Sequence, residues 1–279
     1  MTAMAKRRGA ILALLSVNLI LLSCSTSSAP QPGTPGFYWG AAKETFKAAD
    51  YQKTAEHLNN ILSSDNEYVA RAQPWFLILT SGMVRGDMDL ATAYEAGGKA
   101  FPPQATNFHR QVNQYQSDAN TLALQFAETF AKFDTKGADA VTLSFAYPTG
   151  SPTEPVLLSK ISGGNWPTEA NLATVQKDMI ERGVLLATCR AAGAPDDPAK
   201  VLELLKTGDA KIPRATFIQA MAAALYDQSQ LYVRSRMDQP DRLKIFCDRA
   251  EAALKLVPPS KETQDLEKKI QAAMKRPKG

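Results

Sequence analysis

The chain is poor in the residues that most metal centres and nucleophilic active sites require. Only two histidines, His57 and His109, occur among its 279 residues, and there are three cysteines. It contains no GxxxxGK loop, no GxGxxG fingerprint, no HExxH pair and no GxSxG elbow. His57 adjoins two asparagines on an expected helix face, and His109 has no nearby partner in the sequence. We therefore expect no enzyme, no cofactor and no metal site.

The chain also lacks a strong charge of either sign. The formal net charge is +4. Residues 1–23 carry three of the basic residues and no acidic residue, so the rest has 29 basic against 28 acidic residues. Nucleic-acid binding usually needs a basic face. We therefore expect no nucleic-acid partner.

No apolar run is long enough to span a membrane as a helix. The longest one, between Ile11 and Leu22, follows Lys6-Arg7-Arg8 and is interrupted by two polar residues. A spanning helix needs about 20 apolar residues, whereas an export signal needs fewer. Residues 1–23 are therefore predicted to be a signal peptide.

The end of this run, Leu21-Leu22-Ser23-Cys24, resembles the lipobox of bacterial lipoproteins. The resemblance implies that Cys24 carries a diacylglyceryl thioether, and usually a further fatty acid such as palmitate, after cleavage. Two or three acyl chains anchor a protein stably, because each buried methylene contributes about 0.8 kcal/mol. The alternatives are an ordinary signal peptide with an incidental cysteine and an N-terminal anchor that is never cut. Ser25 follows the cysteine where inner-membrane retention favours Asp, so a Gram-negative source would imply the outer membrane, facing the periplasm.

Residues 24–36 form the next segment, rich in Ser, Pro, Thr and Gly. Such a segment buries little apolar surface and is predicted to be a flexible linker. About 250 residues follow the signal peptide, ample for a folded body.

Residues 37–133 have helical apolar spacing throughout. Turns at residues 49–55 and 86–92 repeat with an offset of 37 residues, and a helix opening at Ser64-Glu67 lies between them. Both turns resemble those of tetratricopeptide repeats, whose period is about 34 residues. The resemblance covers roughly residues 37–100 and implies an all-α array of helical hairpins. A generic hairpin array is the alternative.

Residues 134–168 break this pattern. Residues 141–147 alternate like a strand, and many prolines and glycines follow. Long irregular segments are commonly functional or disordered. The chain's three tryptophans, Trp39, Trp75 and Trp166, are candidate partner-binding residues. Trp166 lies inside the irregular segment, and we favour its packing back into the core over its contacting a partner.

Residues 169–279 return to helical spacing, with helix starts at Thr168, Pro198, Pro213, Pro240 and Ser260. Cys189 and Cys247 lie in this C-terminal helical region. In an oxidising compartment the two could form a disulfide. Two buried free thiols are the alternative.

The sequence thus favours a membrane-anchored lipoprotein of the cell envelope, which acts as a protein-binding scaffold or an accessory subunit of a larger assembly. Stacked helix pairs commonly bind a segment of another protein, so we expect protein partners and no small-molecule substrate. One alternative is an enzyme acting on cell-wall polymer or lipid, with its site near 134–168; it predicts a cleft with converging carboxylates or a histidine. Another is a small-ligand receptor, which would need an enclosed pocket.

Overall fold

The computed structural model describes residues 30–148 and 156–275. Within them the protein is mainly helical, which confirms the all-α prediction at that level. The α-helices are α1 (Pro35–Lys47), α2 (Tyr51–Leu62), α3 (Val69–Ala100), α4 (Ala105–Ala131), α5 (Val156–Ser162), α6 (Glu169–Ala191), α7 (Pro198–Leu204), α8 (Arg214–Ser229), α9 (Pro240–Leu254) and α10 (Lys261–Met274). Short 3₁₀ helices, η1 (Pro102–Gln104) and η2 (Gln230–Tyr232), and strands β1 (Ala140–Leu143) and β2 (Ala210–Pro213) complete the described elements.

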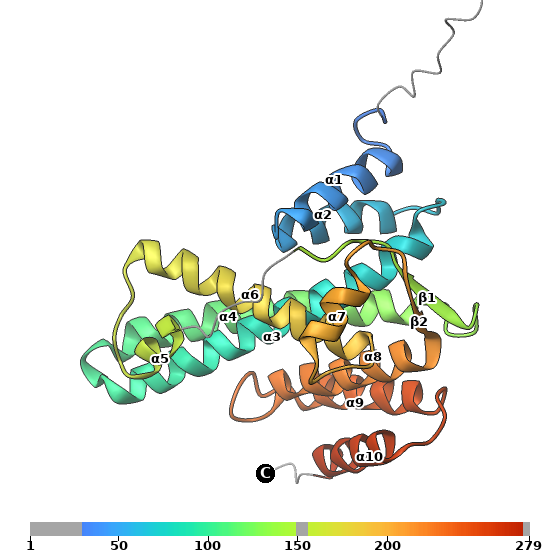
Figure 1. Ribbon diagram of the computed structural model, residues 1–279. Coiled ribbons are helices and arrows are strands. Elements are labelled where there is room, and N and C mark those ends of the chain that lie inside the picture. The colour runs from blue at the N-terminus through green and yellow to red at the C-terminus, as the bar shows by residue number, and fades with distance from the viewer. Residues whose placement is uncertain (1–29, 149–155, 276–279) are drawn as a thin grey trace, which may run out of the picture.

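Helix α3 is the centre of the arrangement (Figure 1). Its most extensive contacts are with α4 and α6, and it also contacts α2, α5 and α8. Helices α1 and α2 pair at one end of the stack, and α8, α9 and α10 follow one another at the other. One long helix therefore connects parts of the chain that are far apart in sequence.

The hydrophobic core is divided along α3. The larger cluster joins α1, α2, the first half of α3, α4, both strands and the C-terminal helices. A smaller cluster surrounds the second half of α3 and includes Tyr94, Phe108, Tyr115, Ile161 and Val175.

The strand predicted at residues 141–147 is present but shorter, at Ala140–Leu143. It pairs antiparallel with β2, which places Ala140 opposite Pro213. The periodicity of residues 210–213 did not predict this partner strand. Val141, Leu143 and Phe145 are buried, so the described start of the irregular segment belongs to the core.

Most of the predicted C-terminal helix starts are confirmed. The Thr168 side chain accepts a hydrogen bond from the Asn171 amide and caps α6. Ser260 forms a capping box with Thr263 at the start of α10. The cap predicted at Ser64-Glu67 is wrong, because α3 begins later, at Val69, with no side-chain cap. The Asn66 side chain organises the turn there by accepting from the Tyr68 amide at 3.0 Å.

The predicted turn at residues 86–92 is also wrong. These residues lie inside α3, which continues without interruption from Val69 to Ala100. Gly86 is the first residue of the expected turn, but a Cβ there would come within 2.8 Å of the Met179 carbonyl oxygen on α6. The glycine therefore permits close helix packing. Only the earlier turn, between α1 and α2, is present as a turn, and Asp50 caps α2 there.

The predicted signal peptide, the lipobox and Cys24 all lie outside the described residues. Within the described part of the chain, no helix has both the length and the apolar character to cross a membrane.

Candidate functional site

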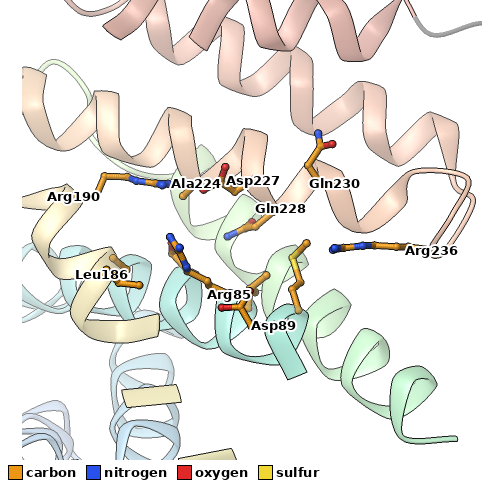
Figure 2. A pocket seen from close by; sticks show the side chains of 13 residues that line it. Arg85, Asp89, Leu186, Arg190, Ala224, Asp227, Gln228, Gln230 and Arg236 are labelled. Carbon is orange, nitrogen blue, oxygen red and sulfur yellow. Dashed lines mark hydrogen bonds and ion pairs between the residues drawn. The ribbon is translucent and has the colours of Figure 1, made fainter. Parts of the chain in front are cut away.

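A cavity of about 350 Å³ opens where α3, α6, α8 and the segment after η2 meet (Figure 2). Helix α3 contributes Arg85 and Asp89, α6 contributes Arg190, and α8 contributes Asp227 and Gln228. Arg236, beyond η2, completes the charged lining. We call this cavity the arginine cavity.

Glycines at the crossing of α3 and α6 set its geometry. A Cβ on Gly82 would lie 2.5 Å from the Val184 Cα, and a Cβ on Gly183 would overlap the Gly82 carbonyl oxygen. Only glycine permits this approach of the two backbones. The crossing fixes α6 beside α3, so the side chains of Arg85 and Arg190 reach the same space.

The charges in the cavity are unevenly paired. Arg190 Nη1 lies 2.6 Å from Asp227 Oδ2, which links α6 to α8. No hydrogen bond or ion pair ties Arg85 to another of the described residues. Arg236 makes one long contact within the described part of the chain, 3.5 Å from its Nη2 to Thr92 Oγ1. Three guanidinium groups thus face two carboxylates, and only Arg190 forms an ion pair among the described residues of the cavity.

The pKa of Asp89 is influenced by two of the cavity's arginines, Arg85 and Arg236. Loss of hydration raises the pKa of its carboxyl, and Arg85, Arg182 and Arg236 partly offset the rise. The arginines therefore act together on one region of the cavity. A carboxylate or phosphate group entering it would meet two guanidinium groups that can each donate two parallel hydrogen bonds.

Gln228 is the most informative residue of the site. Its side chain is only 2% exposed, and neither Nε2 nor Oε1 has a hydrogen-bond partner among the residues that the structure describes. Leaving a buried amide unsatisfied costs about 1–3 kcal/mol, so buried polar groups are nearly always paired. Figure 2 shows the Gln228 amide between Arg85 and Arg236. The amide thus offers one donor and one acceptor to whatever enters the cavity.

The structure places Trp39 and Trp75, two of the candidate partner-binding residues, in the hydrophobic core. Trp75 is fully buried and stacks on Phe145, with ring centroids 5.3 Å apart. Trp39 is 6% exposed and also packs on Phe145. Both rings fill the core because the strand segment folds back over α1 and α3.

Trp166 packs against the core, which is the favoured of the two alternatives, and is also partly exposed. Its ring packs edge-on against Tyr94 and Phe108, at centroid distances of 5.9 and 5.1 Å. Yet 36% of its surface stays exposed. It covers the smaller core cluster and remains reachable from solvent.

Cys189 on α6 and Cys247 on α9 are buried free thiols, the second of the two alternatives for this pair. Of the histidines, His109 is exposed and His57 lies beside Tyr38. The described residues contain no group of three or more His, Cys, Asp or Glu placed to hold a metal ion.

Sequence reasoning missed the arginine cavity entirely. Its lining joins α3 to α6 and α8, which lie about 100 or more residues further along the chain, and no local motif marks it. The available signal in the sequence was the presence of Gly82 and Gly183 inside helical segments, because a glycine within a helix often marks close packing against another helix.

No known family, curated protein or solved structure matches this chain. The functional interpretation of the arginine cavity therefore rests on its geometry and on the chemistry of its side chains.

Proposed function

We propose that this chain is a lipid-anchored protein of the cell envelope that binds a protein partner, and that the arginine cavity holds an anionic group of that partner. The anchor rests on the lipobox-like Leu21-Leu22-Ser23-Cys24 and the linker behind it. In a Gram-negative source the protein would sit on the outer membrane, facing the periplasm. The function needs no catalysis and no cofactor.

The single observation that carries the cavity's role is the buried amide of Gln228, which has no hydrogen-bond partner among the described residues and lies between Arg85 and Arg236. Buried polar groups are usually hydrogen-bonded, so a bound group that pairs with this amide would remove its desolvation cost. Arg85 and Arg236 supply charge, and Gln228 supplies a donor and an acceptor. This set suits a carboxylate with a neighbouring polar group, as at an acidic side chain or a chain terminus.

The resemblance to tetratricopeptide repeats extends, in our proposal, to the first helical hairpin. Helices α1 and α2, with the turn at residues 48–50, are compatible with one tetratricopeptide-like helix pair. Because α3 is continuous, we propose a single such pair packed on a helical body rather than a regular array.

The test is capture from native membranes. The full chain carries a C-terminal tag, and brief crosslinking precedes mass spectrometry. One variant is Cys24→Ala, which removes the lipid site. Another is the double substitution Arg85→Ala/Arg236→Ala. Its matched control is Arg110→Ala/Arg234→Ala, which removes the same charge outside the cavity.

We expect one or a few envelope proteins to be recovered with the wild type and the control. Recovery should fall with the Arg85/Arg236 variant, and with Cys24→Ala because the tether concentrates the protein at the membrane. Recovery of the chain alone, despite intact membrane attachment, would overturn the protein-partner proposal. Undiminished recovery with the Arg85/Arg236 variant would show that the arginine cavity does not bind the partner.

A further inference from the structure

A second cavity lies on the opposite side of α3 from the arginine cavity. Its volume is about 420 Å³, and α2, α3, α4 and one side chain of α6 enclose it. Helix α3 contributes Phe76, Met83 and Asp87. These positions lie about half a helical turn around the axis from Arg85 and Asp89. We call it the Asp87 cavity.

Asp87 is an unusual residue at this depth. Its side chain is 3% exposed, and no hydrogen bond or ion pair joins its carboxyl to another described residue. Burying a carboxyl without a partner is costly, so the protein either neutralises it or supplies a partner from outside. Burial and the nearby Asp118 carboxylate raise the pKa of Asp87 to about 8.

Asp118 is the second carboxylate of the cavity. It accepts two hydrogen bonds from Gln114 Nε2 on the same helix, at 3.0 and 3.1 Å. These bonds hold its side chain in place on α4. The Asp118 carboxyl is therefore held near Asp87, and the two repel each other when both are ionised.

The remaining lining suits a cation with an apolar stem. Glu56 adds a third carboxylate at the rim, and the lining contains no lysine, arginine or histidine. Phe76, Met83 and Leu122 provide apolar surface below the rim, and glutamines surround it. The described residues hold no cluster arranged to bind a metal ion. Carboxylates over an apolar floor favour an alkylammonium group over a bare metal ion, which needs six or so oxygen ligands.

We propose that the Asp87 cavity binds an alkylammonium group, with the carboxylates of Asp87 and Asp118 as its hydrogen-bond acceptors. The group comes either from a free organic amine or from a lysine side chain of a partner. Binding removes the like-charge repulsion between the two aspartates, because a cation placed between them attracts both. The site is separate from the arginine cavity and does not depend on its role.

The experiment is calorimetric titration of the purified, lipidated full chain in detergent. One probe is cadaverine, which represents a free amine. A second is Nα-acetyl-lysine methylamide, which represents a lysine side chain. Pentanol, with a similar stem and no charge, and calcium chloride are the negative probes. The variants are Asp87→Asn and Asp118→Asn, with Asp178→Asn on α6 as the control for a lost charge outside the cavity.

We expect both amines to bind the wild type and the Asp178→Asn chain equally. Asp87→Asn should weaken binding about tenfold or more, since a charge-assisted hydrogen bond is lost. Asp118→Asn should weaken it as well. Tighter binding of cadaverine would identify a free amine as the source, and tighter binding of the lysine analogue would identify a side chain.

Three outcomes would overturn the proposal. In the first, neither amine binds. In the second, Asp87→Asn binds the amines as tightly as Asp178→Asn does. In the third, calcium displaces the amine at a comparable concentration. Asp87→Asn preserves size, and its urea unfolding curve shows whether the variant is folded. A loss of binding can therefore be separated from a loss of structure.

Discussion

Asp87 and Asp89 are two residues apart on α3, yet they line different cavities on opposite sides of the helix. Successive helical residues advance by about 100°, so these two carboxyls point in nearly opposite directions. Asp89 faces Arg85 and Arg236, whereas Asp87 faces Asp118. Two sides of the same helix thus face a region rich in arginine and a region rich in carboxylates.

The first prediction concerns Asp87 and pH. Its pKa rises from the usual 3.8 to about 8 in the folded protein. The folded state therefore holds this proton more tightly than the unfolded state. The stability that the protonated carboxyl contributes is fully present below about pH 4 and is lost as pH rises toward 8, at up to about 1.4 kcal/mol per pH unit.

Asp87→Asn should remove this loss. We expect the free energy of unfolding in urea, measured from pH 5 to pH 9, to fall less steeply for Asp87→Asn than for the wild type. The variant should also be the more stable of the two at pH 9. Asp178→Asn should follow the wild type. Parallel curves for wild type and Asp87→Asn would mean that Asp87 ionises normally.

The second prediction concerns the glycines of the α3–α6 crossing. Gly82→Ala places a Cβ about 2.5 Å from the Val184 Cα, and neither backbone can yield alone. We expect a loss of about 1–3 kcal/mol in unfolding free energy, as for other overpacked cores. Gly40→Ala on α1 is the matched control, because nothing lies within 4 Å of its added Cβ.

Gly40→Ala should stabilise the protein by about 0.5–1 kcal/mol, since alanine is the better helix former. The two variants therefore change the melting temperature in opposite directions. If both stabilise, α3 and α6 are not in close contact at Gly82.

These glycines also show where sequence reasoning ends. The helix starts at Thr168 and Ser260 are predicted correctly, because capping chemistry is local and its residues adjoin the helix end. Gly193, two residues after α6, has the positive φ that is usual for a glycine at a helix end. Gly86 looks the same in sequence, yet it lies inside a helix. A glycine that ends a helix and one that admits a neighbouring helix differ only in tertiary contacts.

The candidate site was unpredictable for a related reason. Arg85 and Gln228 are 143 positions apart, and neither belongs to a local motif. Their proximity follows from the packing of α8 against α3 and α6, which periodicity does not encode. The same holds for β2, whose four residues form a strand only because β1 lies beside them. Periodicity predicts which face of a helix is buried but does not identify the helix that covers it.

The third prediction concerns the free-energy cost of burying the unpaired Gln228 amide. Replacing its unsatisfied amide with an apolar side chain of similar size removes a desolvation penalty. We expect Gln228→Leu to leave the unfolding free energy unchanged or to raise it by about 1 kcal/mol. Partner recovery in the membrane capture should fall at the same time.

Thr188→Val is the control for this change, because Thr188 is also buried but donates to the Val184 carbonyl at 2.7 Å. Losing that satisfied hydrogen bond should destabilise the protein by about 0.5–1.5 kcal/mol. A loss of stability with Gln228→Leu equal to that with Thr188→Val would show that Gln228 serves the fold rather than a ligand.

The fourth prediction concerns the two buried thiols. Burial, with a smaller contribution from Asp197, raises the pKa of Cys189 to about 11. Burial also raises the pKa of Cys247, although Ser229 opposes the shift. The thiolate is the reactive form, and a pKa of 11 leaves only about 0.1% of it at pH 8. In the Cys24→Ala chain, which removes the third cysteine, a thiol reagent should therefore react slowly with the native protein. After unfolding in urea without a reductant, both thiols should react at once. If they react only after a reductant is added, Cys189 and Cys247 are bridged, and α6 and α9 must approach each other more closely than they do here.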